Sequence, residues 1–211
     1  SILNFQFWKI LKKFIDIPEK DLEKICDDAF DFPAPLVKLD EDLHVLELFH
    51  GPTLSFKDFG IRFMARAMSY YVNKESGIGN KGLDIIVATS GDTGGAVASG
   101  FYGLANIRVF ILYPSKRVSE LQEKQIASFG GNIIAIEVAG DFDDCQQLAK
   151  QALGDEELRE QIKLSSANSI NIGRLLAQMY YYGLAKTIDL PVFVVPSGNF
   201  GNLTAGLFAK K

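Results

Sequence analysis

The sequence predicts an α/β fold, built on an open and mostly parallel sheet with helices on both of its faces. Continuous apolar runs rich in Val and Ile alternate along the chain with amphipathic helical patterns. Strands that are apolar on both faces are typical of parallel sheets, which helices cover on either side. The predicted strands of this sheet are residues 83–88, 107–113, 132–138 and 191–195.

Helices are predicted between these strands, and several of their ends carry clear signals. Ser119 and Asp141 are predicted to cap helices that run to about residues 129 and 153, and Gly130-Gly131 stops the first of them. The other helices predicted in this region are residues 92–104, 156–162 and 172–188. A loop at residues 76–80 precedes the alternating region.

The first quarter of the chain is predicted to be mainly helical. Apolar residues at helical spacing predict a helix over residues 5–15, and Pro18 begins a second helix that ends near Phe32-Pro33. The elements that follow are a strand at 45–49, a turn at 51–52 and a helix at 56–73. We therefore expect a helical segment with a connecting strand at 1–50, an α/β domain at 51–188, and the start of a second α/β domain at 189–211.

The composition is that of an ordinary globular protein, with 47% hydrophobic and 23% charged residues. A net charge of -4 gives no support to nucleic-acid or membrane partners. Cys26 and Cys145 lie far apart in the sequence, so we expect reduced, buried or half-buried thiols and no metal site. We see no signal peptide and no apolar run long enough to span a bilayer, which predicts a cytoplasmic protein.

Two glycine-rich segments follow predicted strands and lead into predicted helices. They are Thr89-Ser90-Gly91-Asp92-Thr93-Gly94-Gly95 and Pro196-Ser197-Gly198-Asn199-Phe200-Gly201-Asn202. Either is a tight turn that binds nothing, or its backbone N–H groups and the positive end of its helix hold an anion. The fingerprints of dinucleotide and nucleoside-triphosphate sites are absent from the sequence, which leaves phosphate binding without a nucleotide fingerprint.

Lys57 stands at the start of a predicted helix, directly after the turn His50-Gly51-Pro52-Thr53. A lone lysine near a helix start is usually a solvated surface residue. Here the apolar neighbours Leu54, Phe56 and Phe59 and the helix dipole favour the neutral, nucleophilic amine that a Schiff base needs. Asp58 either pairs with Lys57 or points elsewhere. An amine together with anion-binding loops suggests a cofactor that carries an aldehyde and a phosphate.

The segment from residue 165 to 174 is polar at first and then helical. It is either a capped helix start or a second phosphate site, in which Asn168, Ser169 and the single Arg174 contact the anion. His44 and His50 have no plausible nucleophile beside them in the sequence, so we expect structural roles for both.

Four motifs in this order and spacing resemble the threonine synthase family along nearly the whole chain. They are residues 47–53 leading into 56–59, 88–94, 166–171 and 196–201. That family belongs to the fold-type II pyridoxal-phosphate enzymes, which share the architecture of the tryptophan synthase β subunit. Its members are much longer, so the resemblance implies a fragment that lacks an N-terminal segment and most of the C-terminal half.

The resemblance implies that pyridoxal 5'-phosphate is the cofactor, and that O-phospho-L-homoserine and water become L-threonine and phosphate. It makes Lys57 the catalytic residue, which holds the cofactor through a Schiff base. The cofactor-binding residues that it implies besides Lys57 are Asp92, Ser197, Gly198, Asn199, Phe200, Gly201 and Asn202. The substrate-binding residues that it implies are Thr89, Ser90, Gly91, Thr93, Asn168, Ser169 and Arg174.

Two alternatives share some of these features. A serine or threonine dehydratase has the lysine and the phosphate loop, but its substrate gives no reason for a second phosphate contact at Arg174. A catalytically silent relative would bind the cofactor or a phosphorylated metabolite as a regulator, and the intact Lys57 disfavours this reading.

Overall fold

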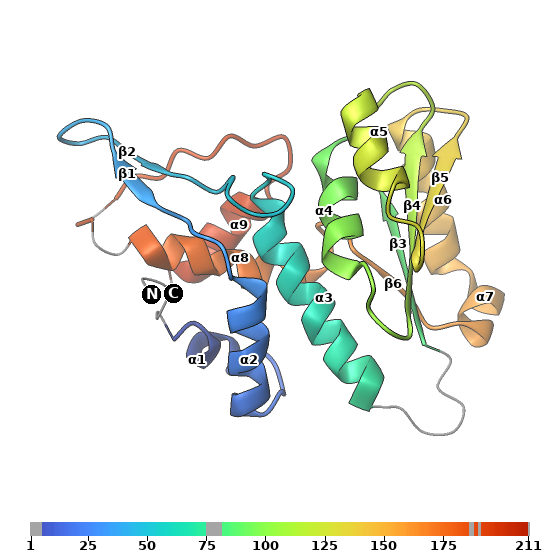
Figure 1. Cartoon of the computed structure of the whole chain (residues 1–211), viewed down its shortest axis with the longest axis horizontal. Helices are drawn as coiled ribbons and strands as arrows, with labels where there is room; N and C mark the ends of the chain where they lie inside the picture. The colour runs from blue at the N-terminus through green and yellow to red at the C-terminus, as the bar shows by residue number, and fades with distance from the viewer. Residues whose placement is uncertain (1–5, 75–81, 186–187, 190, 211) are drawn as a thin grey trace. The chain divides into compact units, whose positions relative to one another are not determined.

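The computed structural model describes residues 6–74, 82–185, 188–189 and 191–210, and the chain divides into two compact units (Figure 1). Unit 1 comprises Ser1–Met64 together with Ile172–Lys211, and unit 2 comprises Ala65–Asn171. The boundary between the units falls within helix α3 (Lys57–Lys74), whose residues up to Met64 belong to unit 1 and whose later residues belong to unit 2. The predicted domain boundaries near residues 50 and 188 stay a prediction.

The centre of unit 2 is a parallel sheet in the order β5-β4-β3-β6. Its strands are β3 (Leu83–Ala88), β4 (Ile107–Pro114), β5 (Ile133–Val138) and β6 (Leu164–Ser166). The register places Ile85 opposite Val109, and Val109 opposite Ile133. The predicted parallel sheet is thus confirmed, and β6 is an additional short strand in a segment that the sequence analysis described only as polar.

Helices cover both faces of this sheet because side chains alternate along buried parallel strands. The helices of unit 2 that follow α3 are α4 (Asp92–Phe101), α5 (Glu120–Ala127), α6 (Phe142–Gly154) and α7 (Glu156–Gln161). Ile86, Ala88 and Leu112 pack against Cys145 of α6 in one apolar cluster. Figure 1 shows α4 on the opposite side of the sheet from α6. The fold class predicted from the apolar runs is therefore confirmed.

Local signals set the ends of several of these helices. Ser119 and Asp141 each form a capping box with the residue three positions later, as predicted. Gly130 and Gly131 both have φ of 61°, a left-handed conformation that glycine adopts without steric cost. The chain can therefore turn sharply from α5 into β5.

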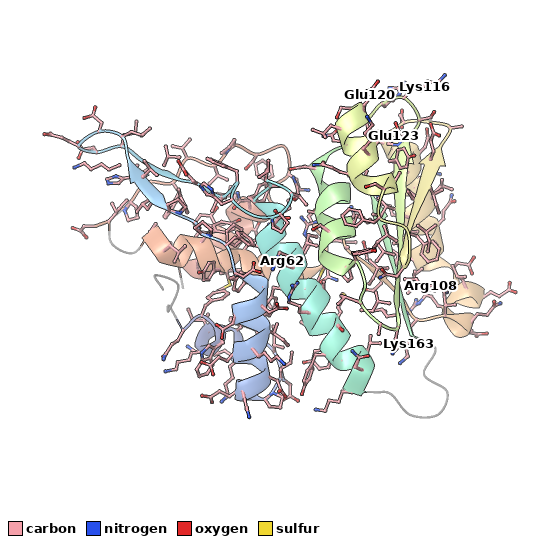
Figure 2. All side chains as sticks on the ribbon, viewed as in Figure 1. Arg62, Arg108, Lys116, Glu120, Glu123 and Lys163 are labelled. Carbon is pink, nitrogen blue, oxygen red and sulfur yellow. The ribbon has the colours of Figure 1, made fainter. Side chains whose placement is uncertain are left out.

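The strand order contains a switch point between β3 and β6. The chain passes from β3 to β4 to β5 toward one edge, and then returns to place β6 on the other side of β3. Figure 2 shows Lys116, Glu120 and Glu123 at the carboxyl end of the sheet, and Arg108 and Lys163 at the opposite end. Open α/β sheets bind ligands beyond the carboxyl ends of their strands, at such a switch point. The residues that follow β3 and β6 therefore occupy the favoured place in unit 2.

Unit 1 is a helical unit with an aromatic core. Besides the start of α3, its helices are α1 (Trp8–Leu11), α2 (Glu19–Ala29), α8 (Ile172–Leu184) and α9 (Gly201–Ala209). The ring of Phe30 stacks on Tyr180 with 4.4 Å between centroids, and the rings of Phe59 and Tyr181 lie 5.3 Å apart. A side chain at Gly60 would come within 3.0 Å of the carbonyl oxygen of Arg174, so α3 and α8 approach closely there. Aromatic packing and a small residue thus fix α8 against α3.

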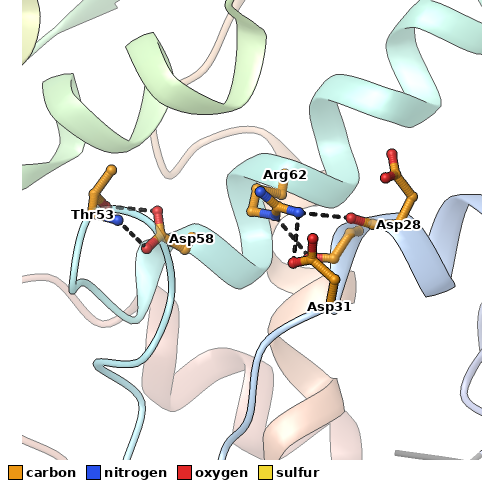
Figure 3. A network of polar contacts seen from close by, with 6 residues as sticks. Asp28, Asp31, Thr53, Asp58 and Arg62 are labelled. Atoms are coloured by element: carbon orange, nitrogen blue, oxygen red, sulfur yellow. Dashed lines mark hydrogen bonds and ion pairs between the residues drawn. The ribbon is translucent and has the colours of Figure 1, made fainter.

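Arg62 ties the start of α3 to the end of α2 (Figure 3). Its Nε donates to the carbonyl of Ala29 at 3.0 Å, and one Nη donates to the carbonyl of Asp28 at 2.8 Å. The same Nη forms an ion pair with Asp31 at 2.7 Å. The last carbonyls of a helix lack intrahelical donors, and here the guanidinium supplies them. This contact holds the helix that begins at Lys57.

The first part of unit 1 differs from the prediction in two places. The helix expected over residues 5–15 is reduced to the single turn of α1, and residues 1–5 lie outside the described chain. Only Trp8 and Leu11 of α1 are buried, so packing supports little more than one turn. The strand expected at 45–49 is instead a hairpin of β1 (Leu36–Lys38) and β2 (His44–Leu46). The loop predicted at 76–80 falls outside the described residues.

The strand predicted at residues 191–195 is wrong. Those residues join no sheet, and the side chains of Val192 and Val194 are each 91% exposed. A strand needs a neighbouring backbone for its hydrogen bonds, and the described sheets provide none beside this segment. Two helices also end earlier than predicted, α8 at Leu184 and α4 at Phe101.

Candidate functional site

Lys57 is the first residue of α3, and a buried carboxylate shapes the turn that precedes it. The Thr53 hydroxyl donates to Oδ1 of Asp58 at 2.6 Å, and the Thr53 N–H donates to Oδ2 at 2.9 Å (Figure 3). A Cβ atom at Gly51 would lie 2.5 Å from Oδ2, so only glycine fits there without a shift. Both carboxylate oxygens of Asp58 therefore accept hydrogen bonds from the turn that precedes Lys57. Burial raises the pKa of Asp58, and the hydrogen bonds from Thr53 partly oppose that rise.

The Lys57 side chain is half-buried beside an aromatic ring. Its Nζ lies 4.7 Å from the centroid of the Phe56 ring, within the range of a cation–π contact. The Lys57 N–H donates to the Ser55 hydroxyl oxygen at 3.3 Å, which supports the first turn of α3. The sequence analysis predicted this location at a helix start with apolar neighbours, and the structure confirms it.

The glycine-rich loop of residues 197–202 belongs to the same unit as Lys57 and leads into α9. Ser197, Gly198, Asn199 and Phe200 are all exposed. The Gly201 N–H donates to Oδ1 of Asn199 at 2.9 Å, which tightens the turn into the helix. An added Cβ at Gly198 would meet no atom within 4 Å among the described residues. The loop therefore leaves backbone surface open at the positive end of α9, where an anion is stabilised.

Arg174 and Asn202 complete the predicted residues of unit 1. Arg174 lies on α8 and is 4% exposed, and its charge lowers the pKa of Tyr181 against the larger rise that burial causes. Asn202 lies on α9, where its side chain accepts hydrogen bonds from Tyr181 and Tyr182. Unit 1 thus contains the predicted amine, the predicted phosphate loop and the predicted arginine.

The glycine-rich loop of residues 89–95 in unit 2 is closed by its own first residue. The buried Thr89 hydroxyl oxygen accepts the N–H groups of Gly94 at 3.0 Å and Gly91 at 3.3 Å, and donates to the carbonyl of Gly91 at 3.0 Å. A Cβ at Gly94 would lie 2.6 Å from the Thr89 methyl and 2.7 Å from Ile126. Ser90 and Asp92 are exposed, whereas Gly91 and Thr93 are half-buried. Thr89 therefore shapes the loop, and the next four residues supply its accessible surface.

Asn168 joins β6 to β3 at the switch point. Its Nδ2 donates to the carbonyl of Ala88 at 2.8 Å, and its Oδ1 accepts the N–H of Ala88 at 3.2 Å. The side chain thus continues the pairing of the two strands two residues beyond the end of β6. Ser169 follows in a turn and is half-buried. The contact of Asn168 and Ser169 with a substrate phosphate stays a prediction.

The sequence analysis missed three residues that shape the candidate site. The roles of Thr53, Tyr181 and Tyr182 depend on which partners the fold brings to them. A partial signal was available, because three tyrosines in succession at 180–182 cannot all face one side of a helix. His50 bonds Glu47 at 2.7 Å, in keeping with its predicted structural role.

Other kinds of site find no support in the part of the chain that the structure describes. No group of three or more His, Cys, Asp or Glu side chains there is placed to share a metal ion. Cys26 and Cys145 are free and buried, as predicted. Of the described helices, none combines the length and apolar character needed to cross a membrane. A cytoplasmic location stays a prediction.

The chain matches the family described as "Pyridoxal-phosphate dependent enzyme" over residues 30–211. It therefore belongs to the pyridoxal-phosphate dependent enzyme family, whose cofactor is pyridoxal 5'-phosphate.

Particular relatives narrow the comparison. Threonine synthase of Serratia marcescens is 53% identical over 211 residues, which cover 96% of this chain and 48% of the relative. The crystal structure of threonine synthase from Escherichia coli superposes with a TM-score of 0.86 at 51% identity, covering 99% of this chain and 50% of that one. The crystal structure of the pyridoxal-phosphate-bound threonine synthase from Brucella melitensis superposes with a TM-score of 0.85 at 39% identity. That match covers 100% of this chain and 47% of the Brucella chain. The chain thus spans about half the length of these relatives.

Proposed function

We propose that this chain carries the cofactor lysine and the phosphate loop of a threonine synthase. Such an enzyme converts O-phospho-L-homoserine and water to L-threonine and phosphate. The observation that carries the proposal is the identity of 53% with a threonine synthase across a region that includes both the Lys57 turn and the loop at 197–202. The partner of this site is therefore a small phosphorylated amino acid.

The chemistry of the residues present fits pyridoxal phosphate. Lys57 offers a primary amine that can hold the cofactor's aldehyde carbon, beside the Phe56 ring and on a turn that Asp58 fixes. The loop at 197–202 offers backbone N–H groups and the positive end of α9 to the phosphate. We assign the cofactor phosphate to Ser197, Gly198, Asn199, Phe200, Gly201 and Asn202, and its phenolic oxygen to Asp92.

When bound, the cofactor supplies an electron sink for the pair released as the substrate loses a proton. The chain must then move protons at defined substrate atoms. With the cofactor and substrate bound, the Lys57 Nζ would take the proton from Cα of the substrate. A second proton would leave Cβ, phosphate would leave Cγ, and a proton would return to Cγ before water adds at Cβ. The proton taken from Cα would then be returned to that carbon to give L-threonine. We assign Lys57 to these transfers because the residue that holds the cofactor would lie beside the reacting carbons.

The remaining residues would bind and orient the substrate. We assign the substrate's carboxylate and phosphate region to the loop with Thr89, Ser90, Gly91 and Thr93. Its phosphate is also assigned to Asn168, Ser169 and Arg174. The exposed Ser90 and the half-buried Thr93 offer hydroxyl donors beyond β3. The guanidinium of Arg174 is suited to a phosphate because it can donate two parallel hydrogen bonds.

The test is the visible absorption spectrum of the chain with added pyridoxal phosphate, before and after O-phospho-L-homoserine. We expect a cofactor band that is absent from Lys57→Ala, that changes with O-phospho-L-homoserine, and that does not change with L-serine. Lys57→Arg is the matched control, because it keeps the positive charge but cannot attach to the aldehyde. A band that Lys57→Ala retains would refute the role of Lys57. A spectrum that changes with L-serine alone would favour a dehydratase.

A further inference from the structure

Two tyrosines on α8 bond the last residue of the phosphate loop. The Tyr181 hydroxyl donates to Oδ1 of Asn202 at 2.6 Å. The Tyr182 hydroxyl lies 2.8 Å from the same Oδ1 and 3.0 Å from the carbonyl oxygen of Asn202. Both contacts lie within unit 1, so they belong to one compact part of the molecule. They join the buried side of α8 to the first turn of α9.

These contacts determine which atoms of the Asn202 side chain remain available. An amide oxygen has two lone pairs, and each faces a tyrosine hydroxyl. The single proton of Tyr182 is shared between this oxygen and the carbonyl oxygen of Asn202. The Nδ2 group carries two N–H donors, and none of the described residues accepts a hydrogen bond from it. Asn202 is half-buried, so these donors are neither fully solvated nor used by the protein. An amide held in this way is suited to donate to an anion.

The tyrosines are themselves held in place. The ring of Tyr181 packs against Phe59 at 5.3 Å and Tyr182 at 5.1 Å between centroids. A Cβ atom at Gly206 would come within 2.8 Å of the Tyr182 ring, so α9 lies directly against that ring. Burial raises the pKa of both hydroxyls, that of Tyr181 well above its ordinary value. Both therefore stay protonated and able to donate at neutral pH.

We propose that Tyr181 and Tyr182 are positioning residues that turn the Nδ2 group of Asn202 toward the phosphate of the cofactor. This inference rests on the proposed function, which assigns that phosphate to the loop at 197–202. The tyrosines act through Asn202, to which both of their hydroxyl groups bond. They consequently strengthen the binding of a phosphorylated ligand over that of the same ligand without its phosphate.

The test compares dissociation constants for pyridoxal phosphate and for pyridoxal, which lacks the phosphate. Tyr181→Phe is expected to raise the dissociation constant for pyridoxal phosphate by about fivefold to tenfold, the effect of one hydrogen bond. The dissociation constant for pyridoxal is expected to stay unchanged. Tyr180→Phe is the matched control, because the buried Tyr180 hydroxyl has no hydrogen-bond partner among the described residues. It is expected to change neither constant. Thermal unfolding without cofactor checks that each variant folds.

Asn202 supplies the second variant. Asn202→Asp keeps an oxygen for the tyrosines but replaces the N–H donor with a negative charge. It should therefore weaken the binding of pyridoxal phosphate more than Tyr181→Phe does. In the double variant Tyr181→Phe/Asn202→Ala, the loss should equal that of Asn202→Ala alone, because the tyrosine acts through the asparagine.

The outcomes separate the inference from the proposed function. Additive losses in the double variant, or an equal loss for both ligands in Tyr181→Phe, would overturn the positioning role and leave the phosphate loop intact. Equal affinity of the unmodified chain for pyridoxal phosphate and pyridoxal, or no binding of either, would overturn the phosphate loop itself and the positioning role with it.

Discussion

The glycine loop of unit 2 is closed by its own buried threonine, whereas the glycine loop of unit 1 is exposed and is held through one asparagine. In the loop at 89–95, Thr89 takes up two backbone N–H groups, and Asn168 pins the preceding strand through Ala88. In the loop at 197–202, the side chains from Ser197 to Phe200 are exposed, and the tyrosines reach only Asn202.

This difference separates backbone that the protein's own hydrogen bonds already use from backbone that is open to a ligand. Where backbone donors already have partners, a substitution leaves them unsatisfied and lowers the free energy of unfolding. Where the backbone is open, the same kind of substitution leaves stability nearly unchanged and alters binding instead. Each loop therefore predicts a different result for a matched change.

The largest effect is expected from Gly94→Ala. The added methyl would lie 2.6 Å from Thr89 and 2.7 Å from Ile126, so the core of unit 2 must shift. We expect a loss of about 2–3 kcal/mol in the free energy of unfolding, measured by urea denaturation. Gly198→Ala is the control from the other loop, because its methyl meets nothing within 4 Å. Similar losses for the two variants would contradict the comparison.

A loss of about 2 kcal/mol is expected from Asn168→Ala, which removes two hydrogen bonds to the backbone of the buried Ala88. Asn199→Ala in the exposed loop removes one hydrogen bond, to Gly201, and should cost less than about 1 kcal/mol. Urea denaturation of both variants measures the difference. If Asn199→Ala were the more destabilising change, the loop of unit 1 would be the more rigid one.

Thr89→Val should cost about 1–2 kcal/mol, because it keeps the shape of the side chain but removes the hydroxyl acceptor of the Gly91 and Gly94 N–H groups. The Gly94 N–H then keeps only its longer contact with the Gly91 carbonyl at 3.3 Å. Thr89→Ser keeps the hydroxyl and loses only a methyl group, and we expect it to be the milder change. Thermal unfolding of the pair measures this order. The reverse order would show that the methyl contact, and not the hydrogen bonds, closes the loop.

The smallest effect concerns one thiol in each unit. Burial raises the pKa of Cys26 to about 12 and also raises that of Cys145, so both thiols stay protonated and unreactive in the folded chain at pH 8. Alkylation should then require local opening, and Gly94→Ala should speed it at Cys145 more than at Cys26. Peptide mass spectrometry after timed alkylation measures the two rates. Equal acceleration would show that the units open together.

The elements that depend on local signals could be predicted from the sequence. The observed boundaries of β3 are those predicted from the sequence. The predicted helix caps at Ser119 and Asp141 are also observed, because side-chain oxygens there bond the helix start directly. The strand at 191–195 failed because a strand depends on a partner that its own sequence does not specify. β6 was missed because three residues carry too little pattern.

The candidate site divides in the same way. The location of Lys57 at a helix start follows from its own neighbours, and so was predictable. The bonds from Tyr181 and Tyr182 to Asn202 join positions about twenty residues apart, and only the packing of α8 on α9 brings them together. The direction of the Asp58 carboxylate, left open by the sequence, depends on the path of the turn.

The most direct measurement is borohydride reduction of the chain with pyridoxal phosphate, followed by peptide mass spectrometry to locate the attached pyridoxyl group. The account predicts attachment at Lys57 as the single major site, and its loss in Lys57→Ala. Attachment spread over several surface lysines, or at the same level in Lys57→Ala, would contradict the account.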